Sequence, residues 1–516
     1  MNWDWEDFEK KMKTGYSPED LALVKKAFEK TKEVYQDDRR LTGESCLSHL
    51  TKVAKKAVLL KLDAETVAAG LLHDSVEDKK LELAEIKKAF GENIAFLVKS
   101  VTEIDEVKYH GVEETTEAIR KMFLAVAKDI RVVFIKFIDR LENLKTLDVF
   151  PEEKRKRKAL ETLEIYSPVA NRLGMGEMKA ELEDAAFKYV WPEEYQYIIR
   201  ETQKRMPERQ KYLEKIKPLI QKELEKEKIK IIDVHSREKH YYSLWKKLKS
   251  REMDWEQITD LVALRIIVDN IENCYKALGV LHKLWKPLPG KIKDYISLPK
   301  PNGYQSLHTT VFCEEGKITE FQIRTPEIHE AAERGIAAHW AYEEVGKKEK
   351  AHLPARLAAK RAGKAGKKIR PKNFEWVKQL MGWQKKFSAK GGREKQSPAE
   401  FLESLKLDLF KDRIFVLTPK GDVIDLPEGA TAVDFAYHIH SELGKHMTGA
   451  KANGKIISFS RPLVSGDIVE ILTSKNQKPN LEWLNHAKTR LARSHIRLDP
   501  CLKNQPNHIF QHLGLV

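Results

Sequence analysis

Residues of the metal-binding types occur in three separated segments of the N-terminal third of the chain. These segments are residues 40–49 (RLTGESCLSH), 71–78 (LLHDSVED) and 136–146 (KFIDRLENLKT). If the second segment is helical, His73 lies four residues before Glu77 and Asp74 four before Asp78, so two adjacent rows of ligand-type side chains form. Mixed nitrogen and oxygen ligands with positions left for water suit a catalytic divalent ion such as Mn²⁺. The alternative for a lone His-Asp dipeptide is a helix-surface pair, and the three segments together favour the metal site.

The third of these segments supplies one more carboxylate. Asp139, Asn143 and Thr146 share one face of the predicted helix, while Ile135 and Ile138 supply nearby apolar contacts. We therefore expect this helix to turn polar side chains toward the other two segments.

A different chemistry is expected of residues 291–324, which read as a loop followed by two strands. Prolines and Gly303 make the loop a turn that cannot be helical. The second strand, 318–325, places Glu320, Gln322 and Arg324 on one face and apolar side chains on the other. Together with the Lys, Asn, Tyr and His of the loop, this face could hold a polyphosphate. On the period alone, a solvated face of a sheet is the preferred interpretation.

Length and composition limit the class of protein. At 516 residues the chain is too long for one core, and three or four domains are expected. The formal charge of +15 favours a polyanionic partner such as a nucleotide, RNA or the ribosome. The cysteines are scattered without a CxxC pair, which predicts a reducing compartment and no structural zinc site; they are Cys46, Cys274, Cys313 and Cys501. We find no signal peptide and no apolar run long enough for a bilayer, so we expect a soluble cytoplasmic protein that does not enter membranes.

The elements that position these residues differ along the chain. Residues up to about Pro192 are expected to be helical, and 193–231 to be a charged helical connector. Residues 237–251 are predicted as a basic helix that could line a phosphate site or form a solvated surface. Residues 260–269 read as a buried strand with Asp260 at its start. Asp260 and Glu320 would then lie on neighbouring strands, where two carboxylates can hold Mg²⁺ beside a triphosphate.

The C-terminal part is expected to contain a flexible segment and a small domain. Residues 346–372 are rich in Lys, Arg, Ala and Gly and are typical of a linker, with rRNA contact as the alternative. Trp376 and Trp383 follow on an amphipathic stretch. Residues 412–474 predict a hairpin, a helix capped by Thr431 and closed by Gly444, and a final strand.

The first three segments also carry a resemblance. HDSVED, preceded by GESCLSH and followed by DRLENLKT, resembles the HD hydrolase domain of long RelA/SpoT homologues, the stringent-response enzymes that make and degrade (p)ppGpp. The resemblance implies Mn²⁺ ligands at His49, His73, Asp74 and Asp139. It further implies that Glu77 and Asp78 position and activate the attacking water, and that Arg40, Asn143 and Thr146 bind the nucleotide. The chain departs from the family at Ser45-Cys46 and at Glu142, neither of which is a ligand position.

The central region resembles the pyrophosphokinase (synthetase) domain of the same family, most specifically in GYQSLHTT and EFQIRT. The resemblance implies Asp260 as a metal ligand and Glu320 as a metal ligand or general base toward the 3′-OH of the acceptor. Tyr304 would stack on guanine. The nucleotides would be held by Arg237, Lys239, Ser243, Lys247, Lys293, Lys300, Asn302, His308, Gln322 and Arg324. The basic sequence Lys291-Ile292-Lys293-Asp294 is similar to the version found in bifunctional members.

The small C-terminal domain resembles the TGS domain, a β-grasp module. His440 is the best match for the residue that meets the tRNA acceptor end in ribosome-bound relatives, and the alternative is a surface residue on a capped helix. The tail beyond Arg497 does not match, so we expect the far C-terminal regulatory domains of longer relatives to be lacking.

The sequence thus predicts a multidomain α and α+β protein. Its expected parts are an all-α HD hydrolase domain (1–192), a helical connector (193–231), a mixed-sheet, nucleotidyltransferase-like synthetase domain (232–345), a basic linker and helix (346–410), a β-grasp TGS domain (411–475) and a tail (476–516). The predicted function is bifunctional: pyrophosphate transfer from ATP to GTP or GDP with Mg²⁺, and hydrolysis of ppGpp or pppGpp with Mn²⁺, with the ribosome and uncharged tRNA as further partners. The alternatives are a synthetase with a decayed hydrolase and a non-catalytic regulator that docks on ribosome or tRNA.

Overall fold

The computed structural model describes residues 5–13, 15–105, 121–122, 125, 128–258, 261–300, 302–338, 413–474 and 476–499. It divides into two compact units, Met1–Arg393 and Glu394–Val516. Several predictions lie outside the described residues: those for Asp260, for the linker at 346–372, for Trp376 and Trp383, and for the tail beyond residue 499.

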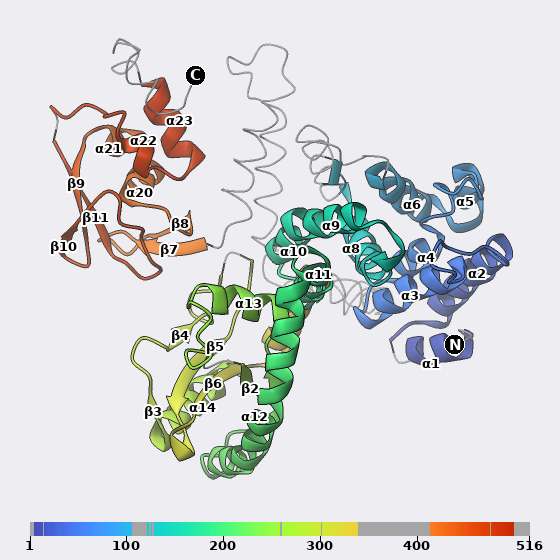
Figure 1. Ribbon diagram of the computed structural model, residues 1–516, viewed down its shortest axis with the longest axis horizontal. Helices are drawn as coiled ribbons and strands as arrows, with labels where there is room; N and C mark the ends of the chain where they lie inside the picture. Colours follow the sequence, from blue (N-terminus) through green and yellow to red (C-terminus); the bar gives the residue numbers. More distant parts are fainter. Residues whose placement is uncertain are drawn as a thin grey trace, which may run out of the picture. The chain divides into compact units, whose positions relative to one another are not determined.

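The first part of unit 1 is built of helices, as predicted (Figure 1). Capping side chains set where several of them begin: Ser17 and Asp20 form a capping box at α2, and Ser45 and Asp63 accept from backbone N–H groups at α3 and α4. The elements are α1 (Trp5–Met12), α2 (Pro18–Val34), α3 (Cys46–Leu59), α4 (Ala64–Leu72), α5 (Leu83–Phe90), α6 (Glu92–Asp105), α8 (Arg131–Leu144), η1 (Leu147–Val149), α9 (Glu152–Glu161), a π-helical turn η2 (Thr162–Tyr166), α10 (Ser167–Arg172) and α11 (Gly176–Val190).

The helix predicted over residues 71–78 is shorter in the structure. Helix α4 ends at Leu72, and residues 73–79 form turns. One helix-like hydrogen bond survives, from Asp78 N to Asp74 O at 2.8 Å. Val67, Leu71 and Leu72 are buried, at 0 to 1% exposure, so the apolar part of the segment is helical and the acidic part is not.

The second part of unit 1 is a mixed sheet covered by helices. Within the described residues the strand order is β1-β2-β6-β5-β3, with β4 paired to β5; β2 and β6 are parallel and the other pairs antiparallel. The strands are β1 (Ile231–Glu238), β2 (Val262–Val268), β3 (Lys286–Pro287), β4 (Lys293–Asp294), β5 (Leu307–Phe312) and β6 (Ile318–Arg324). The helices are α12 (Pro192–Lys226), α13 (Tyr241–Lys249), α14 (Ile271–Leu284), η3 (Glu314–Gly316) and α15 (Pro326–Arg334).

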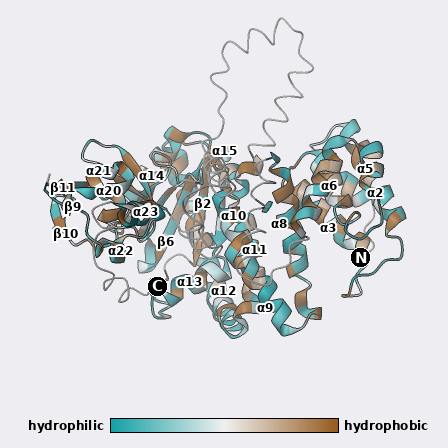
Figure 2. Ribbon diagram, turned by 90° about the horizontal axis from the view of Figure 1, so that it is seen from above, coloured by the Kyte–Doolittle hydropathy of each residue, from teal (hydrophilic) through white to brown (hydrophobic). Residues whose placement is uncertain are grey.

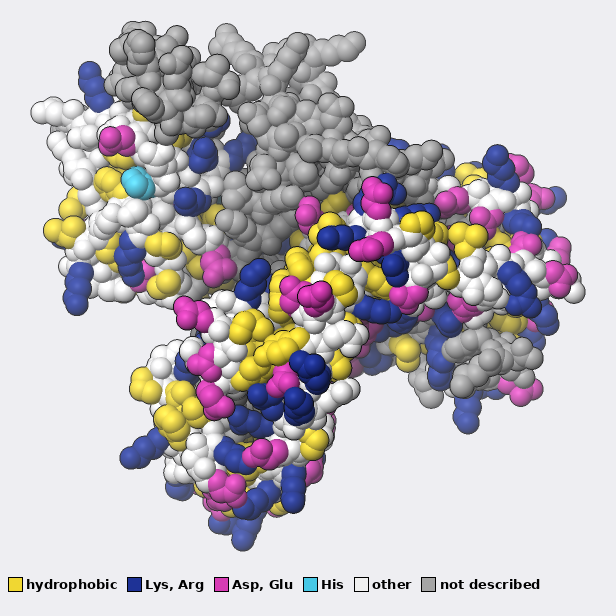
Figure 3. All heavy atoms as spheres, viewed as in Figure 1, with side chains coloured by type: hydrophobic (Ala, Val, Ile, Leu, Met, Phe, Trp, Pro, Cys, Tyr) yellow, Lys and Arg dark blue, Asp and Glu magenta, His cyan; other side chains and the backbone are white. Residues whose placement is uncertain are grey.

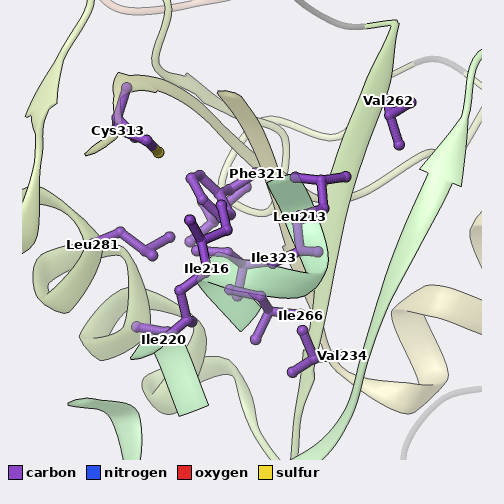
Figure 4. Packing of buried hydrophobic residues seen from close by; sticks show 14 of the residues in the cluster. Leu213, Ile216, Ile220, Val234, Val262, Ile266, Leu281, Cys313, Phe321 and Ile323 are labelled. Atoms are coloured by element: carbon purple, nitrogen blue, oxygen red, sulfur yellow. The ribbon is translucent and has the colours of Figure 1, made fainter. Parts of the chain in front are cut away.

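The apolar core of this part lies between the sheet and the helices. Phe321 and Ile323 of β6 are fully buried, as their alternation predicts, and pack near Ile266 of β2 and Ile216 of α12 (Figure 4). Helix α12, which covers the segment predicted as a connector, therefore contributes residues to the core of the sheet.

The prediction of a basic helix over residues 237–251 is wrong for its first residues. Arg237 belongs to strand β1, paired with Ala263 of β2, and α13 begins only at Tyr241. The antiparallel register with β2 extends through Glu238, so sheet pairing continues farther than the local sequence indicates.

In its described residues, unit 2 has two small antiparallel sheets and a group of helices. Strand β7 (Arg413–Leu417) forms the predicted hairpin with β8 (Val423–Pro427), and β9 (Met447–Ala452) lies between β10 (Lys455–Ile457) and β11 (Val469–Thr473). Asn453 and Gly454 both have positive φ, +51° and +80°, so the expected turn joins β9 to β10. Helices α22 (Trp483–His486) and α23 (Arg490–Leu498) follow.

The single helix predicted from Thr431 to Gly444 is broken in the structure. Helix α20 (Ala432–Ile439) begins with a Thr431–Asp434 capping box, but His440 is extended, with φ −164°, and starts α21 (Ser441–Lys445). The His440 side chain accepts a hydrogen bond from Glu442 N at 3.2 Å, so the imidazole caps the second helix.

Hydrophobic and hydrophilic residues alternate around the helices in Figure 2, as expected of helices with one buried face. On the face drawn in Figure 3, Lys and Arg side chains are interspersed with Asp and Glu. In the described part of the chain no helix has the length and apolarity needed to span a membrane.

Candidate functional sites

Two histidines and two aspartates converge in the helical part of unit 1. His49 Nε2 lies 3.2 Å from Asp139 Oδ1, and His73 Nε2 lies 3.0 Å from Asp74 Oδ1 and 3.5 Å from Asp139 Oδ1. His49 comes from α3, His73 and Asp74 from the turn that follows α4, and Asp139 from α8 (Figure 1). These elements pack against one another, so the tertiary fold brings together the residues that the three sequence segments supply.

The chemistry of this cluster fits a divalent cation. His73 Nδ1 bonds Gly70 O at 2.9 Å, which places the proton on Nδ1 and turns the lone pair of Nε2 toward the carboxylates. Nε2 is buried, and within the described residues none of its contacts has the alignment of a hydrogen bond. A ring nitrogen facing carboxylate oxygens is a ligand set for a metal ion, and His49, His73 and Asp74 offer atoms within 4.8 Å of one another.

The electrostatics of the cluster agree with that assignment. Burial works against charge on His73, but Asp74 and Asp139 outweigh it and raise its pKa well above the usual range. Without a cation, a proton on Nε2 therefore balances the carboxylates, and a metal ion bound there would take the place of that proton. Burial likewise opposes charge on Asp139, yet Lys136 and the two histidines hold the pKa of this carboxyl well below its usual range. Lys136 is itself buried, with Nζ 3.1 Å from Asp139 Oδ2. Two aspartates therefore stay ionised in a buried place and attract positive charge.

A cavity of about 470 Å³ opens onto this cluster. All the predicted hydrolase-site residues except His73 line it, and His73 lies beneath, fully buried. Arg40 Nη2 donates to Asn143 Oδ1 at 2.5 Å, and Asn143 Nδ2 donates to Asp139 Oδ1 at 2.8 Å. The complete lining is Arg39, Arg40, Leu41, Thr42, Cys46, His49, Asp74, Glu77, Asp78, Asp139, Asn143, Thr146, Leu147, Val149, Phe150 and Lys158.

A second cavity, of about 310 Å³, lies on the sheet. It is lined by Arg237, Glu238, Lys239, His240, Ser243, Ala263, Lys293, Tyr295, Lys300, Tyr304, His308, Glu320 and Gln322. The polar face of β6 is therefore not a solvated one. Gln322 is 4% exposed and Arg324 is fully buried, so the interpretation of a sheet with one wet face is wrong.

Hydrogen bonds connect the polar residues of this second cavity. Tyr304 Oη lies 2.8 Å from His308 Nε2, and His308 Nδ1 lies 3.1 Å from Glu320 Oε1. Gln322 Nε2 donates to the same oxygen of Glu320 at 3.1 Å. Burial outweighs the attraction of Glu320 and lowers the pKa of His308, so a neutral imidazole stands beside the carboxylate.

Two buried arginines lie behind this cavity. Arg265 Nη2 and Arg324 Nη1 are each 3.0 Å from Glu333 Oε1. Burial first, and then Arg324, lower the pKa of Arg265 to about 10. Burial opposes charge on Glu333, but Arg265 and the other arginines outweigh it and lower its pKa. The single negative charge of Glu333 thus pairs with two guanidinium groups. One net positive charge therefore remains beneath a cavity that is already lined with lysines.

Comparison with known proteins decides the family. Residues 27–176 match the HD domain, 236–347 match the region found in RelA / SpoT proteins, and 414–473 match the TGS domain. The chain is 46% identical over 496 residues to guanosine-3′,5′-bis(diphosphate) 3′-pyrophosphohydrolase of Aquifex aeolicus, 44% over 487 to GTP pyrophosphokinase of Myxococcus xanthus and 42% over 484 to bifunctional (p)ppGpp synthase/hydrolase RelA of Mycobacterium tuberculosis.

The chain belongs to the RelA/SpoT family.

These matches cover 95, 93 and 93% of this chain, which spans 66, 61 and 63% of the three relatives. The predicted classes of all three domains are confirmed: a helical HD domain, a RelA/SpoT domain with a mixed sheet and a TGS domain with a small antiparallel sheet. The HD domain implies dependence on a divalent metal.

Four residues predicted for the second site are not among the described residues that line its cavity. Asp260 lies outside the described residues, and Lys247, on α13, is absent from the lining. Arg324 lies behind the cavity. Asn302 instead donates to the backbone oxygen of Asn171 at 3.0 Å, and its own Oδ1 accepts from Tyr304 N at 3.2 Å.

Sequence reasoning missed several residues of both cavities. Lys158 of α9 lines the HD cavity, where burial and then Arg140 lower its pKa. In the sequence it is one of many lysines in a charged helix, so only its partly buried place in the cavity wall distinguishes it. In the second cavity Tyr295, Glu238 and His240 were missed.

Two positions at which the chain departs from the family have distinct surroundings. Glu142 is buried and pairs with Lys145 at 2.6 Å. Cys46 lines the HD cavity, where burial and Asp78 raise the pKa of the thiol.

Proposed function

We propose that this chain is a bifunctional (p)ppGpp enzyme. The RelA/SpoT region would transfer pyrophosphate from ATP to the 3′-OH of GTP or GDP, and the HD domain would hydrolyse the 3′-pyrophosphate of (p)ppGpp. The observation that carries the proposal is the presence of two separate cavities of different chemistry, one on a histidine–aspartate cluster and one around a carboxylate among cations. The names of the relatives cover both reactions.

For hydrolysis we assign Mn²⁺ to His49, His73, Asp74 and Asp139. A bound divalent ion supplies Lewis acidity and lowers the pKa of a coordinated water. Glu77 and Asp78 would position and activate the attacking water, since both line the cavity beside Asp74. Arg40 would pack on guanine, while Asn143 and Thr146 contact the rest of the nucleotide.

For synthesis we assign Glu320 as a Mg²⁺ ligand or as the general base toward the 3′-OH, with Asp260 as the second ligand. Cationic side chains that line the cavity would hold the phosphates and offset their charge in the transition state. These are Arg237, Lys239, Lys293 and Lys300, with Ser243 as a hydroxyl donor. We also propose that Lys247, Asn302 and Arg324 contribute to nucleotide binding, although they do not line the described cavity. Tyr304 would stack on guanine.

We also propose that the TGS domain contacts uncharged tRNA on the ribosome through His440. The supporting observation is that this imidazole is exposed, on a turn between two helices. The domain limits 1–192, 193–231, 232–345, 346–410, 411–475 and 476–516 remain our proposal for the division of the chain.

Two reactions with one purified protein test the proposal. ATP plus GTP should give pppGpp, and ppGpp plus Mn²⁺ should give GDP and pyrophosphate, both read by nucleotide chromatography. Glu320→Gln should abolish synthesis and leave hydrolysis near that of the parent, because this carboxylate lies only in the sheet domain. Synthesis without hydrolysis would favour the synthetase-only alternative, and no turnover in either reaction would favour the non-catalytic regulator.

A further inference from the structure

We propose that Glu333 is a positioning residue for the synthetase carboxylate Glu320, acting through two hydrogen-bond routes that both pass through buried Arg324. This inference rests on the proposed synthetase function of Glu320. Glu333 lies on α15 and is not among the residues that line the cavity, so it would act on the reaction only through its neighbours.

The first step is the charge pairing of Glu333. Its Oε1 lies 3.0 Å from Arg324 Nη1 and 3.0 Å from Arg265 Nη2, and both arginine side chains are buried, at 0 and 4% exposure. A buried guanidinium needs a carboxylate or other acceptors to offset its lost hydration. Glu333 therefore fixes where the Arg324 guanidinium lies.

The first route runs through an aromatic residue and a histidine. Arg324 Nη2 donates to Tyr304 Oη at 2.6 Å. Because a guanidinium can only donate, the Tyr304 oxygen accepts there and its own proton is directed to His308 Nε2, 2.8 Å away. A neutral His308 that accepts at Nε2 carries its proton on Nδ1, which then donates to Glu320 Oε1 at 3.1 Å.

The second route runs through an amide. Gln322 Oε1 lies 3.4 Å from Arg324 Nη2 and 3.4 Å from Arg265 Nη2, both of which can only donate. The amide oxygen must therefore face the arginines, and the amide nitrogen faces Glu320, to whose Oε1 it donates at 3.1 Å. Both routes end on the same oxygen, so the directions of these two hydrogen bonds to Glu320 Oε1 follow from the arginine pair.

This arrangement gives Tyr304 a function beyond its ring. If Tyr304 only stacks on guanine, phenylalanine is an equivalent residue at this position. If its hydroxyl connects Arg324 to His308, Tyr304→Phe breaks the first route and leaves the ring in place. The two interpretations thus make different predictions for a single oxygen atom.

The test compares Glu333→Gln, Tyr304→Phe and their double variant with the parent in steady-state pyrophosphate transfer. Glu327→Gln, on the exposed first turn of the same helix, is the matched control. We expect kcat to fall by roughly 10- to 100-fold in each single variant, the scale of a small misplacement of a catalytic group, with KM for GTP within about threefold of the parent. The double variant should be no slower than Glu333→Gln, because residues on one path are not additive.

Hydrolysis of ppGpp by the same preparations monitors the HD domain, and a KM for GTP near that of the parent shows that the sheet domain is still folded. Full kcat in Tyr304→Phe, or losses that multiply in the double variant, would overturn the inference. A rise in KM alone would also overturn it, since that result assigns these residues to binding. Failure of the proposed function gives a different pattern: the parent makes no product, or Glu320→Gln remains active.

Discussion

The hydroxyl of Tyr35 donates a hydrogen bond to Asp78 Oδ2 at 2.9 Å. Tyr35 is 1% exposed and lies at the C-terminal end of α2, while Asp78 lies in the turn after α4 and lines the HD cavity. Burial first, and then Asp78, raise the pKa of Tyr35, so the phenol stays protonated and can only donate to this carboxylate. Tyr35, which lies outside the three segments that supply the proposed metal ligands, therefore orients Asp78, one of the two proposed water-activating residues.

Tyr35→Phe should lower ppGpp hydrolysis by about fivefold, corresponding to the roughly 1 kcal/mol of one hydrogen bond, while pyrophosphate transfer stays unchanged. The matched control is Tyr16→Phe, which removes a hydroxyl that donates to Leu62 O at 2.5 Å in the same helical part. Equal effects of both substitutions on hydrolysis would indicate loss of packing rather than loss of a positioned Asp78.

Asp74→Ala and Glu77→Gln should fail differently. Asp74 belongs to the proposed ligand set, so its loss should reduce bound Mn²⁺ together with hydrolysis. Glu77→Gln keeps the size of the side chain and should retain the metal, while turnover falls by a factor on the order of 10²–10⁴, the usual contribution of a positioned acid or base. Elemental analysis beside ppGpp turnover measures both effects.

Chelation of the parent should reproduce Asp74→Ala, and added Mn²⁺ should restore the chelated parent but not Glu77→Gln. Loss of metal from Glu77→Gln would show that the ligand and water-activating roles are wrongly assigned. Parent-like hydrolysis by both variants would contradict the HD assignment itself.

His440 has a structural contact that must be separated from the proposed tRNA contact. His440→Ala removes the cap of α21 and should cost ~1 kcal/mol of local stability. His440→Asn can keep a capping acceptor while it removes the imidazole. If the imidazole meets tRNA, both variants should lose stimulation by ribosomes carrying uncharged tRNA, with basal synthesis unchanged. Full stimulation of His440→Asn would assign the residue to capping alone.

The RelA/SpoT domain should lose local stability in acid because of His329. Its Nδ1 faces Arg265 Nη1 at 3.3 Å, and burial, then Arg265, lower its pKa to about 4 from 6.5. Between these values the unfolded chain binds more protons than the folded one, so stability rises with pH. The contribution of neutral His329 to the free energy of unfolding is complete above about pH 6.5 and is lost as pH falls toward 4.

His329→Gln should flatten this dependence. Hydrogen-exchange protection factors of α15 and β2, measured from pH 4.5 to 7.5, should decrease in acid for the parent and change less for the variant. The neutral end of the range is the internal control for other effects of the substitution. A variant with the same slope as the parent would show that another group controls the acid transition.

The sequence alone determined much of this protein. Because helix and strand periods and capping residues are local, they predicted the helical N-terminal part, the alternation of β6 and the hairpin of β7 and β8. The motifs around His73 and Tyr304 predicted the family. Of the nine residues predicted for the hydrolase site, eight line one cavity, and the ninth, His73, is buried next to it.

Tertiary structure decided the remainder, for physical reasons that local sequence does not contain. Pairing with β2 made Arg237 a strand residue, and the burial of Arg324 placed it behind the cavity rather than in its wall. Tyr35 and Glu333 were not singled out, because a tyrosine at a helix end and a glutamate in a charged helix have no distinguishing local pattern. Their partners lie 43 residues away for Tyr35 and 9 residues away for Glu333, and only the folded chain brings those atoms within hydrogen-bond distance.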